Sequence, residues 1–274
     1  PDGSRAEIRA WLERNAAEQN PAVYSRIDFQ DELTLAKPRT VRHLYTLDLD
    51  PPDAAPTRIT RGWFNHDDAT YTPDGAAIVY STPKRTDTHP DRVLDRELWM
   101  MRSDGSDDRP LLRMPGWRLD EPRPGPDGAT LAFRGEQTDE PAYRQTRLGL
   151  GPLPDLRPET ILWLTEEDRP DGITDGSVSS FRWRRNPLSL VYRTARGGGF
   201  PLLTIEPEDL RPRDLIADLD PDAAGPNRHP ELGVYAFDVA AGRILYTATT
   251  PRHPSVLRLR DTSGYRVIHD PNPW

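Results

Sequence analysis

The sequence predicts an all-β protein, a β-propeller of four-stranded antiparallel blades, with about five blades in this chain and a short helix near its start. The first observation is a repeat, since apolar segments recur 53, 51, 53 and 52 residues apart, at Arg58, Leu111, Leu162, Leu215 and Val267. The second is that each repeat holds two pairs of strand-like segments joined by tight turns. The third is the presence of 30 Pro and 19 Gly, which indicates frequent turns.

One helix is predicted near the start of the chain, between Arg5 and Gln19. Apolar residues there have helical spacing and form one stripe, made of Ile8, Trp11, Leu12 and Ala16. We expect this helix to cap or flank the first blade.

The strands are predicted from short apolar runs that follow turn signals. The turns Tyr71-Thr-Pro-Asp-Gly75 and Gly125-Pro-Asp-Gly128 contain the residues that a tight reversal needs. Each precedes an apolar run, and a further strand-like segment follows about twenty residues later. Strands are therefore predicted near residues 77–81, 97–101, 130–134, 146–150, 189–193, 201–205, 243–248 and 255–260.

A four-stranded unit of about 50 residues cannot bury both of its faces alone, so copies must stack around an axis. We therefore predict one propeller domain over residues 1–274. Its blades are expected at residues 1–62, which lack a clear innermost strand, and at 63–117, 118–170, 171–228 and 229–274.

Composition excludes several classes of function. The net charge is −8 and the chain has no cluster of Lys and Arg, which disfavours nucleic acid as a partner. No apolar run approaches the ~18 residues of a membrane helix, so no membrane partner is expected. The chain has no Cys, which excludes disulfides and thiolate chemistry and is compatible with a cytoplasmic location.

No complete catalytic or metal-binding motif is present. The chain has neither the Gly-x-Ser-x-Gly of a nucleophile elbow nor the His-Glu-x-x-His of a zinc peptidase. The segment Asp218-Leu-Asp220-Pro-Asp222 resembles a calcium loop but has Ala223 where Gly is needed and His229 where a Glu is needed. We expect no catalytic residues, no metal and no cofactor in this chain.

The innermost strands hold the best candidates for a binding site. Aligning the repeats places Thr70, Arg123, Arg182 and Ala236 at equivalent positions. Arg123 and Arg182 can therefore both point into the axial channel, where a guanidinium would hold a carboxylate in bidentate fashion. The alternative is that their stems pack between blades with the charged ends in water.

Aromatic and basic residues in the loops that enter the innermost strands are candidates for the mouth of a substrate channel. They are Trp63, Phe64, Trp117 and Arg118. Packing within the protein is the alternative fate of such aromatic side chains.

Several segments together resemble the propeller of S9 (prolyl oligopeptidase family) serine peptidases, especially the acylaminoacyl-peptidase branch. They are Asn20-Pro-Ala-Val-Tyr-Ser-Arg-Ile-Asp-Phe29, Arg42-His-Leu-Tyr45, Ile59-Thr-Arg-Gly62 and Asp67-Asp68, which occur in the same order in that branch. The resemblance implies a parent of about seven blades joined to a C-terminal α/β-hydrolase domain that carries Ser, Asp and His. That domain is absent from these 274 residues. The Pro-Asp-Gly hairpins also recur in TolB-type propellers.

The leading hypothesis is a non-catalytic propeller that gates the access of short peptides to a separate α/β-hydrolase domain. Its partners would be peptide substrates and that domain, and a homo-oligomer is compatible with the sequence. The alternative is a stand-alone TolB-like propeller that acts as a protein- or peptide-binding module. A third hypothesis, an enzyme with its own metal or carboxylate centre in the channel, is disfavoured by the missing ligand motifs.

Overall fold

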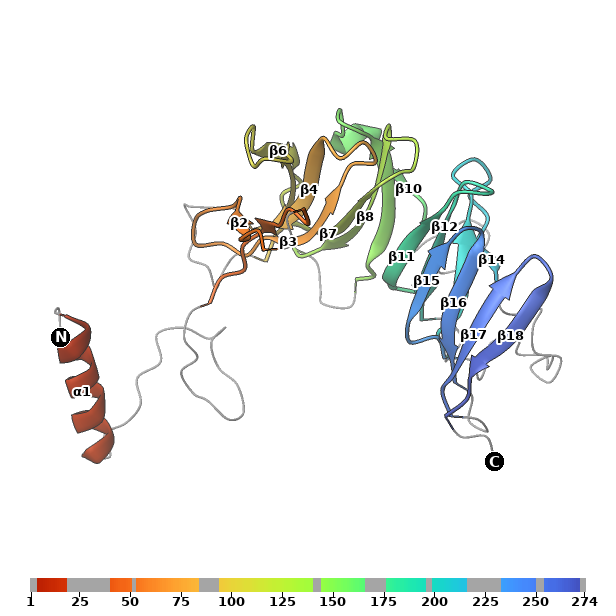
Figure 1. Cartoon of the computed structure of the whole chain (residues 1–274). Helices are drawn as coiled ribbons and strands as arrows, with labels where there is room; N and C mark the ends of the chain where they lie inside the picture. Colours follow the sequence, from red (N-terminus) through yellow and green to blue (C-terminus); the bar gives the residue numbers. More distant parts are fainter. Residues whose placement is uncertain are drawn as a thin grey trace. The chain divides into compact units, whose positions relative to one another are not determined.

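The computed structural model describes residues 4–18, 40–50, 53–83, 94–139, 144–165, 176–195, 199–215, 233–249 and 254–271. Strands are the main secondary structure of these residues, and one α-helix precedes the first strand (Figure 1). This confirms the predicted all-β fold class with a short N-terminal helix. The chain divides into two compact units, residues 1–40 with 89–92 and residues 41–88 with 93–274. The assignment of the whole chain to one domain with the five predicted blades stays a prediction.

Helix α1 (Arg5–Ala17) begins at a capping box. The backbone N–H of Glu7 donates to the Ser4 hydroxyl, and the Ser4 N–H donates back to the Glu7 carboxylate. No residue of α1 is buried, and Ile8 and Leu12 of the predicted four-residue apolar stripe are exposed. That this helix caps or flanks the first blade stays a prediction. The described part of the chain contains no helix with the length and apolarity needed to cross a membrane.

In the second unit, the described residues form four sheets of four antiparallel strands, and in each sheet the strands that are consecutive in the chain pair with one another. The first sheet is β3 (Asp67–Tyr71), β4 (Ala77–Thr82), β5 (Glu97–Arg102) and β6 (Arg109–Leu112). The second is β7 (Trp117–Pro124), β8 (Thr130–Gln137), β9 (Arg147–Pro152) and β10 (Leu162–Trp163), and a 3₁₀-helix, η2 (Pro158–Thr160), precedes β10.

The third sheet is β11 (Val178–Arg184), β12 (Ser189–Thr194), β13 (Leu202–Ile205) and β14 (Arg213–Asp214). The fourth is β15 (Phe237–Ala240), β16 (Arg243–Ala248), β17 (Val256–Asp261) and β18 (Gly264–His269). A two-stranded sheet of β1 (Tyr45–Thr46) and β2 (Thr57–Arg58) precedes all four. Every strand predicted by position is confirmed, as β4, β5, β8, β9, β12, β13, β16 and β17.

The core lies between successive sheets because side chains alternate across each strand. In β8, Leu131 and Phe133 pack towards the first sheet, whereas Ala132 packs towards the third. In β12, Tyr192 belongs to the core shared with the second sheet, and Val191 belongs to the core shared with the fourth. Both faces of the second and third sheets are therefore covered by neighbouring sheets.

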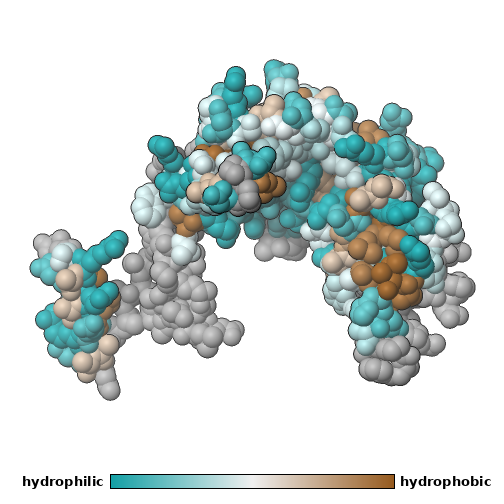
Figure 2. Space-filling view, viewed as in Figure 1, coloured by the Kyte–Doolittle hydropathy of each residue, from teal (hydrophilic) through white to brown (hydrophobic). Residues whose placement is uncertain are grey.

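The fourth sheet is covered differently on its two faces. Ile244 and Tyr246 of β16 are buried against the third sheet. Leu245, between them, is 38% exposed, and Leu257 and Leu259 on the neighbouring strand β17 are only partly buried. Figure 2 shows hydrophobic side chains gathered on this sheet. We call Leu245, Leu257 and Leu259 the leucine face.

A polar contact between neighbouring sheets recurs at the fifth residue of the second strand. Ser81 of β4 donates to the backbone oxygen of Leu119 at 2.7 Å. Arg134 of β8 donates to the backbone oxygen of Ser179 at 3.1 Å, and Arg193 of β12 to that of Tyr235 at 2.6 Å. These bonds connect each of the first three sheets to backbone oxygens in, or just before, the first strand of the next sheet.

Candidate functional site

The site begins at irregularities in the first strands of the sheets. The pairing of β3 with β4 shifts between Asp67 and Thr70, and that of β7 with β8 shifts between Asp120 and Arg123. Asp68 and Glu121 lie at these β-bulges and have φ angles of 54° and 52°. Non-glycine residues rarely adopt such angles, and bulges re-aim side chains. The Glu121 N–H donates to the Asp68 carboxylate at 3.1 Å.

The bulge in β7 places the Glu121 carboxylate, only 10% exposed, among three arginines. Arg123 Nη2 and Arg182 Nη1 lie 3.3 and 3.1 Å from Glu121 Oε1, and Arg134 Nε lies 3.1 Å from Oε2. These arginines come from β7, β8 and β11, so the contacts join the second and third sheets. We call Glu121, Arg123, Arg134 and Arg182 the arginine cluster.

The fourth sheet also contributes to the surroundings of Arg182. Asp238 Oδ1 lies 3.5 Å from Arg182 Nε, although its side chain is 74% exposed. The ring of Phe237 lies 5.9 Å from the Arg182 guanidinium carbon, within cation–π range. Trp183 donates from its indole N–H to the Arg123 backbone oxygen at 2.9 Å, which fixes β11 against β7.

The structure corrects one step in the alignment of the repeats. Thr70, Arg123 and Arg182 each pair with the third residue of the second strand of their sheet. In the fourth sheet the third residue of the second strand, Leu245, pairs with Asp238 and not with Ala236. The predicted equivalence of Ala236 is therefore wrong by two positions. The reason is that only residues 241–242 separate β15 from β16, whereas residues 72–76, 125–129 and 185–188 separate the corresponding strands elsewhere.

A second group of charged residues connects the first and second sheets. Arg96 lies between two carboxylates, with its Nη2 2.6 Å from Asp67 and its Nε 3.0 Å from Asp120. Arg42 also bonds to Asp67, and Arg118 Nε lies 2.9 Å from Asp120. Burial alone would raise the pKa of Asp67, but the hydrogen bond from Arg42 and the charge of Arg96 outweigh it, so this pKa lies below its usual value.

The predicted site residues fall into three groups. Arg123 and Arg182 are brought together on the Glu121 carboxylate. Trp117 and Arg118 lie at the opposite end of β7 from Arg123, where the Trp117 ring stacks on Trp163 at 4.9 Å.

Trp63, which is 68% exposed, and the half-buried Phe64 lie before β3. That these four residues, Trp63, Phe64, Trp117 and Arg118, line a substrate channel stays a prediction, as does the same role for Arg123 and Arg182.

Sequence reasoning missed the acids around which the arginines gather. Glu121, Arg134 and Asp238 were not identified as site residues. A signal was present, because the pairs Asp67-Asp68 and Asp120-Glu121 are separated by 53 residues, one full repeat. Two acids recurring at one repeat position could have identified both bulges.

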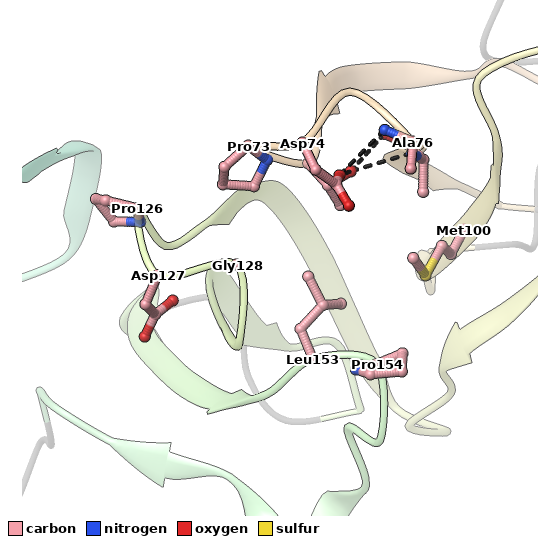
Figure 3. A pocket seen from close by; sticks show the side chains of 11 residues that line it. Pro73, Asp74, Ala76, Met100, Pro126, Asp127, Gly128, Leu153 and Pro154 are labelled. Atoms are coloured by element: carbon pink, nitrogen blue, oxygen red, sulfur yellow. Dashed lines mark hydrogen bonds between the residues drawn. The ribbon is translucent and has the colours of Figure 1, made fainter.

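A pocket of about 420 Å³ lies between equivalent turns of the first and second sheets (Figure 3). Pro73 and Asp74 come from one turn and Pro126 and Asp127 from the other, while Met100 and Leu153 contribute apolar side chains. The Asp74 carboxylate accepts hydrogen bonds from the Thr72 hydroxyl and the Ala76 N–H, which lower its pKa.

The described residues include no group of three or more His, Asp or Glu side chains that could hold a metal ion.

No model of a known protein family matches this sequence, and no curated protein sequence matches it. Solved structures do resemble it. A puromycin hydrolase mutant matches with a TM-score of 0.62 and 22% identity over 84% of this chain and 35% of the hydrolase. TolB from Acinetobacter baumannii matches with a TM-score of 0.55 and 13% identity, over 83% of this chain and 49% of TolB.

The acylaminoacyl peptidase of Pyrococcus horikoshii also matches, with a TM-score of 0.55 and 14% identity over 88% of this chain and 35% of the peptidase. The chain thus spans about a third of the length of these two hydrolytic enzymes and about half that of TolB. These likenesses show the propeller fold. The predicted resemblance to S9 peptidase propellers, acylaminoacyl peptidase among them, is confirmed at this structural level.

Proposed function

We propose that this chain is a non-catalytic propeller that admits only short peptides to a separate α/β-hydrolase domain. The observation that carries the proposal is the convergence of Arg123 and Arg182, from the first strands of neighbouring sheets, on one buried carboxylate. In a propeller the first strands lie nearest the axis, so this charge would lie where a peptide passes. The structural likeness to a puromycin hydrolase and an acylaminoacyl peptidase supports the same proposal.

A stand-alone propeller that binds a protein or peptide is the second candidate function. The structural likeness to TolB supports it, and so does the partly exposed leucine face of the fourth sheet. Large contiguous apolar patches on a protein surface mark interaction sites.

The product of the complete gene distinguishes the two functions. If it contains a hydrolase domain, we expect it to cleave short peptides and to lose activity steeply as peptides carrying the same scissile bond are lengthened. The 274-residue chain alone should show no turnover, because its sequence has no nucleophile elbow. Equal values of kcat/KM for short and long unstructured peptides would contradict gating. A complete gene product without a hydrolase domain would favour the binding module.

A further inference from the structure

The arginine cluster holds more hydrogen-bond donors than its own acceptors can use. Each guanidinium carries about five N–H donors, whereas a carboxylate offers about four acceptor positions. Three guanidinium groups share the Glu121 carboxylate, and part of the surplus goes to backbone oxygens of β11. The Nε of Arg123 is buried and has no hydrogen-bond partner among the described residues. The cluster can therefore accept a second anionic group.

All three arginines are partly exposed, Arg123 and Arg182 more than Arg134, whose side chain is 24% exposed. The side chains of Arg123 and Arg182 are 35% and 34% exposed, against 10% for Glu121. Glu121 thus closes the buried side of the cluster, and Arg123 and Arg182 form its accessible side. Phe237, beside Arg182, adds an apolar surface next to the charge.

The charge balance also favours an anion. The cluster itself holds three arginines and one buried carboxylate. Two further acids lie outside it: Asp238, which is mostly exposed and 3.5 Å from Arg182, and Asp68, whose carboxylate accepts the Glu121 N–H at 3.1 Å. Adding one carboxylate to the cluster would reduce its excess positive charge without reversing it. The protein's own partner of these arginines, the Glu121 side chain, is a carboxylate, and a carboxylate can match the planar guanidinium in bidentate geometry.

We propose that the arginine cluster binds the terminal carboxylate of a peptide through Arg123 and Arg182, in competition with the internal carboxylate of Glu121. This inference rests on the proposed function, since it names the peptide group that the propeller recognises. Peptides with a free carboxyl end are then retained at the first strands, and amidated peptides are not.

The test is a binding titration of the 274-residue chain, so it requires no hydrolase domain. The probes are acetyl-trialanine with a free carboxyl end, its C-terminal amide, and acetate, each followed by calorimetry at low salt. We expect the free acid to bind and the amide not to bind. Arg182→Gln should raise the Kd of the acid about tenfold, and Glu121→Gln should lower it about tenfold, because the competing carboxylate is lost.

Controls separate this effect from a change in folding or in general charge. Arg213→Gln removes an exposed arginine of β14 that pairs with Glu206, and it should leave the Kd unchanged. Circular dichroism checks that each variant is folded, and if Glu121→Gln fails to fold, Arg123→Gln and Arg182→Gln still test the site. Binding of the acid and amide with equal Kd, or weaker binding of the acid by Glu121→Gln, would overturn the proposal.

Acetate that binds as tightly as the tripeptide acid would overturn its assignment to a peptide. These outcomes are independent of gating. If the chain binds the free acid but the complete gene product cleaves long peptides as fast as short ones, the carboxylate site is supported and the gating function is not. If the chain does not bind the free acid but cleavage depends on peptide length, gating is supported and the carboxylate site is not.

Discussion

At the scale of single residues, Asp67 shows how a partly buried acid connects two sheets. Its side chain is only 13% exposed and bonds to Arg96 and Arg42, while Arg96 also contacts Asp120 of the second sheet. Removing one partner of a buried ion pair is costly because the other charge remains desolvated. In this case Asp120 would still pair with Arg96, so the cost should be moderate.

We predict that Asp67→Asn lowers the free energy of unfolding by about 2 kcal/mol at neutral pH, less than the ~3–5 kcal/mol of a fully isolated buried charge. The pKa of Asp67 is lowered in the folded state, so its contribution is present above the usual Asp pKa and is lost as pH falls through the folded value. The difference between wild type and variant in urea unfolding should therefore shrink below about pH 4. Asp155→Asn, in an exposed loop, is the control. A difference that stays constant down to acid pH would contradict the prediction.

The residues of the arginine cluster were only partly predictable. Arg123 and Arg182 could be found because they share a repeat position, and strand pairing follows the repeat. The recurring acids mark the position of Glu121 in the sequence, but the direction of its side chain could not be predicted, because a bulge with a φ of 52° aims it and regular strand alternation would not put it there. Asp238 was missed because a shorter turn shifts the register of the fourth sheet.

At the scale of elements, the bonds made by the fifth residue of the second strand join one sheet to the next. Arg193 makes two of them, with Nη1 3.2 Å from the Val234 oxygen and 2.6 Å from the Tyr235 oxygen. Its Nε also donates to the Ser179 hydroxyl at 2.6 Å within its own sheet. The guanidinium therefore holds the segment that enters β15. Its loss would leave these backbone oxygens without their donor.

We predict that Arg193→Met lowers the free energy of unfolding by about 1–3 kcal/mol, the cost of losing hydrogen bonds to a charged donor. Amide hydrogen exchange should become faster in residues 233–240 and stay unchanged in β8 and β9. Arg213→Met, on the outer strand β14, serves as the matched control and should leave exchange in 233–240 unchanged. Unchanged exchange in 233–240 of Arg193→Met would show that packing alone holds this segment.

Secondary structure was predictable where burial is strong. The second and third strands of the first three sheets are largely buried, and each was predicted close to its observed position. The outer strands β10 and β14 contain two residues each, too few for a periodic pattern. Their positions came from the 51–53-residue repeat, which reflects the regular succession of sheets.

At the scale of the whole second unit, stability depends on how many faces of each sheet are covered. The second and third sheets have neighbours on both faces, whereas the fourth buries Ile244 and Tyr246 on one face and leaves the leucine face partly exposed on the other. In repeat architectures stability is approximately a sum of the intrinsic stability of each repeat and of its interfaces with its neighbours. The fourth sheet has one interface fewer of this kind.

We predict that the fourth sheet opens before the second in native-state amide hydrogen exchange. The free energy of opening measured at β16 and β17 should be lower than that at β8 and β9, because local opening there separates a single apolar interface. Ile244→Ala, which removes a side chain only 3% exposed, should lower the opening free energy of β16 by about 2–4 kcal/mol. Leu245→Ala, at the adjacent position on the leucine face, should lower it by much less, since its side chain is already 38% exposed. Equal protection of β8 and β16 from hydrogen exchange, together with equal effects of the two substitutions, would contradict the prediction and would mean that the leucine face is covered in solution.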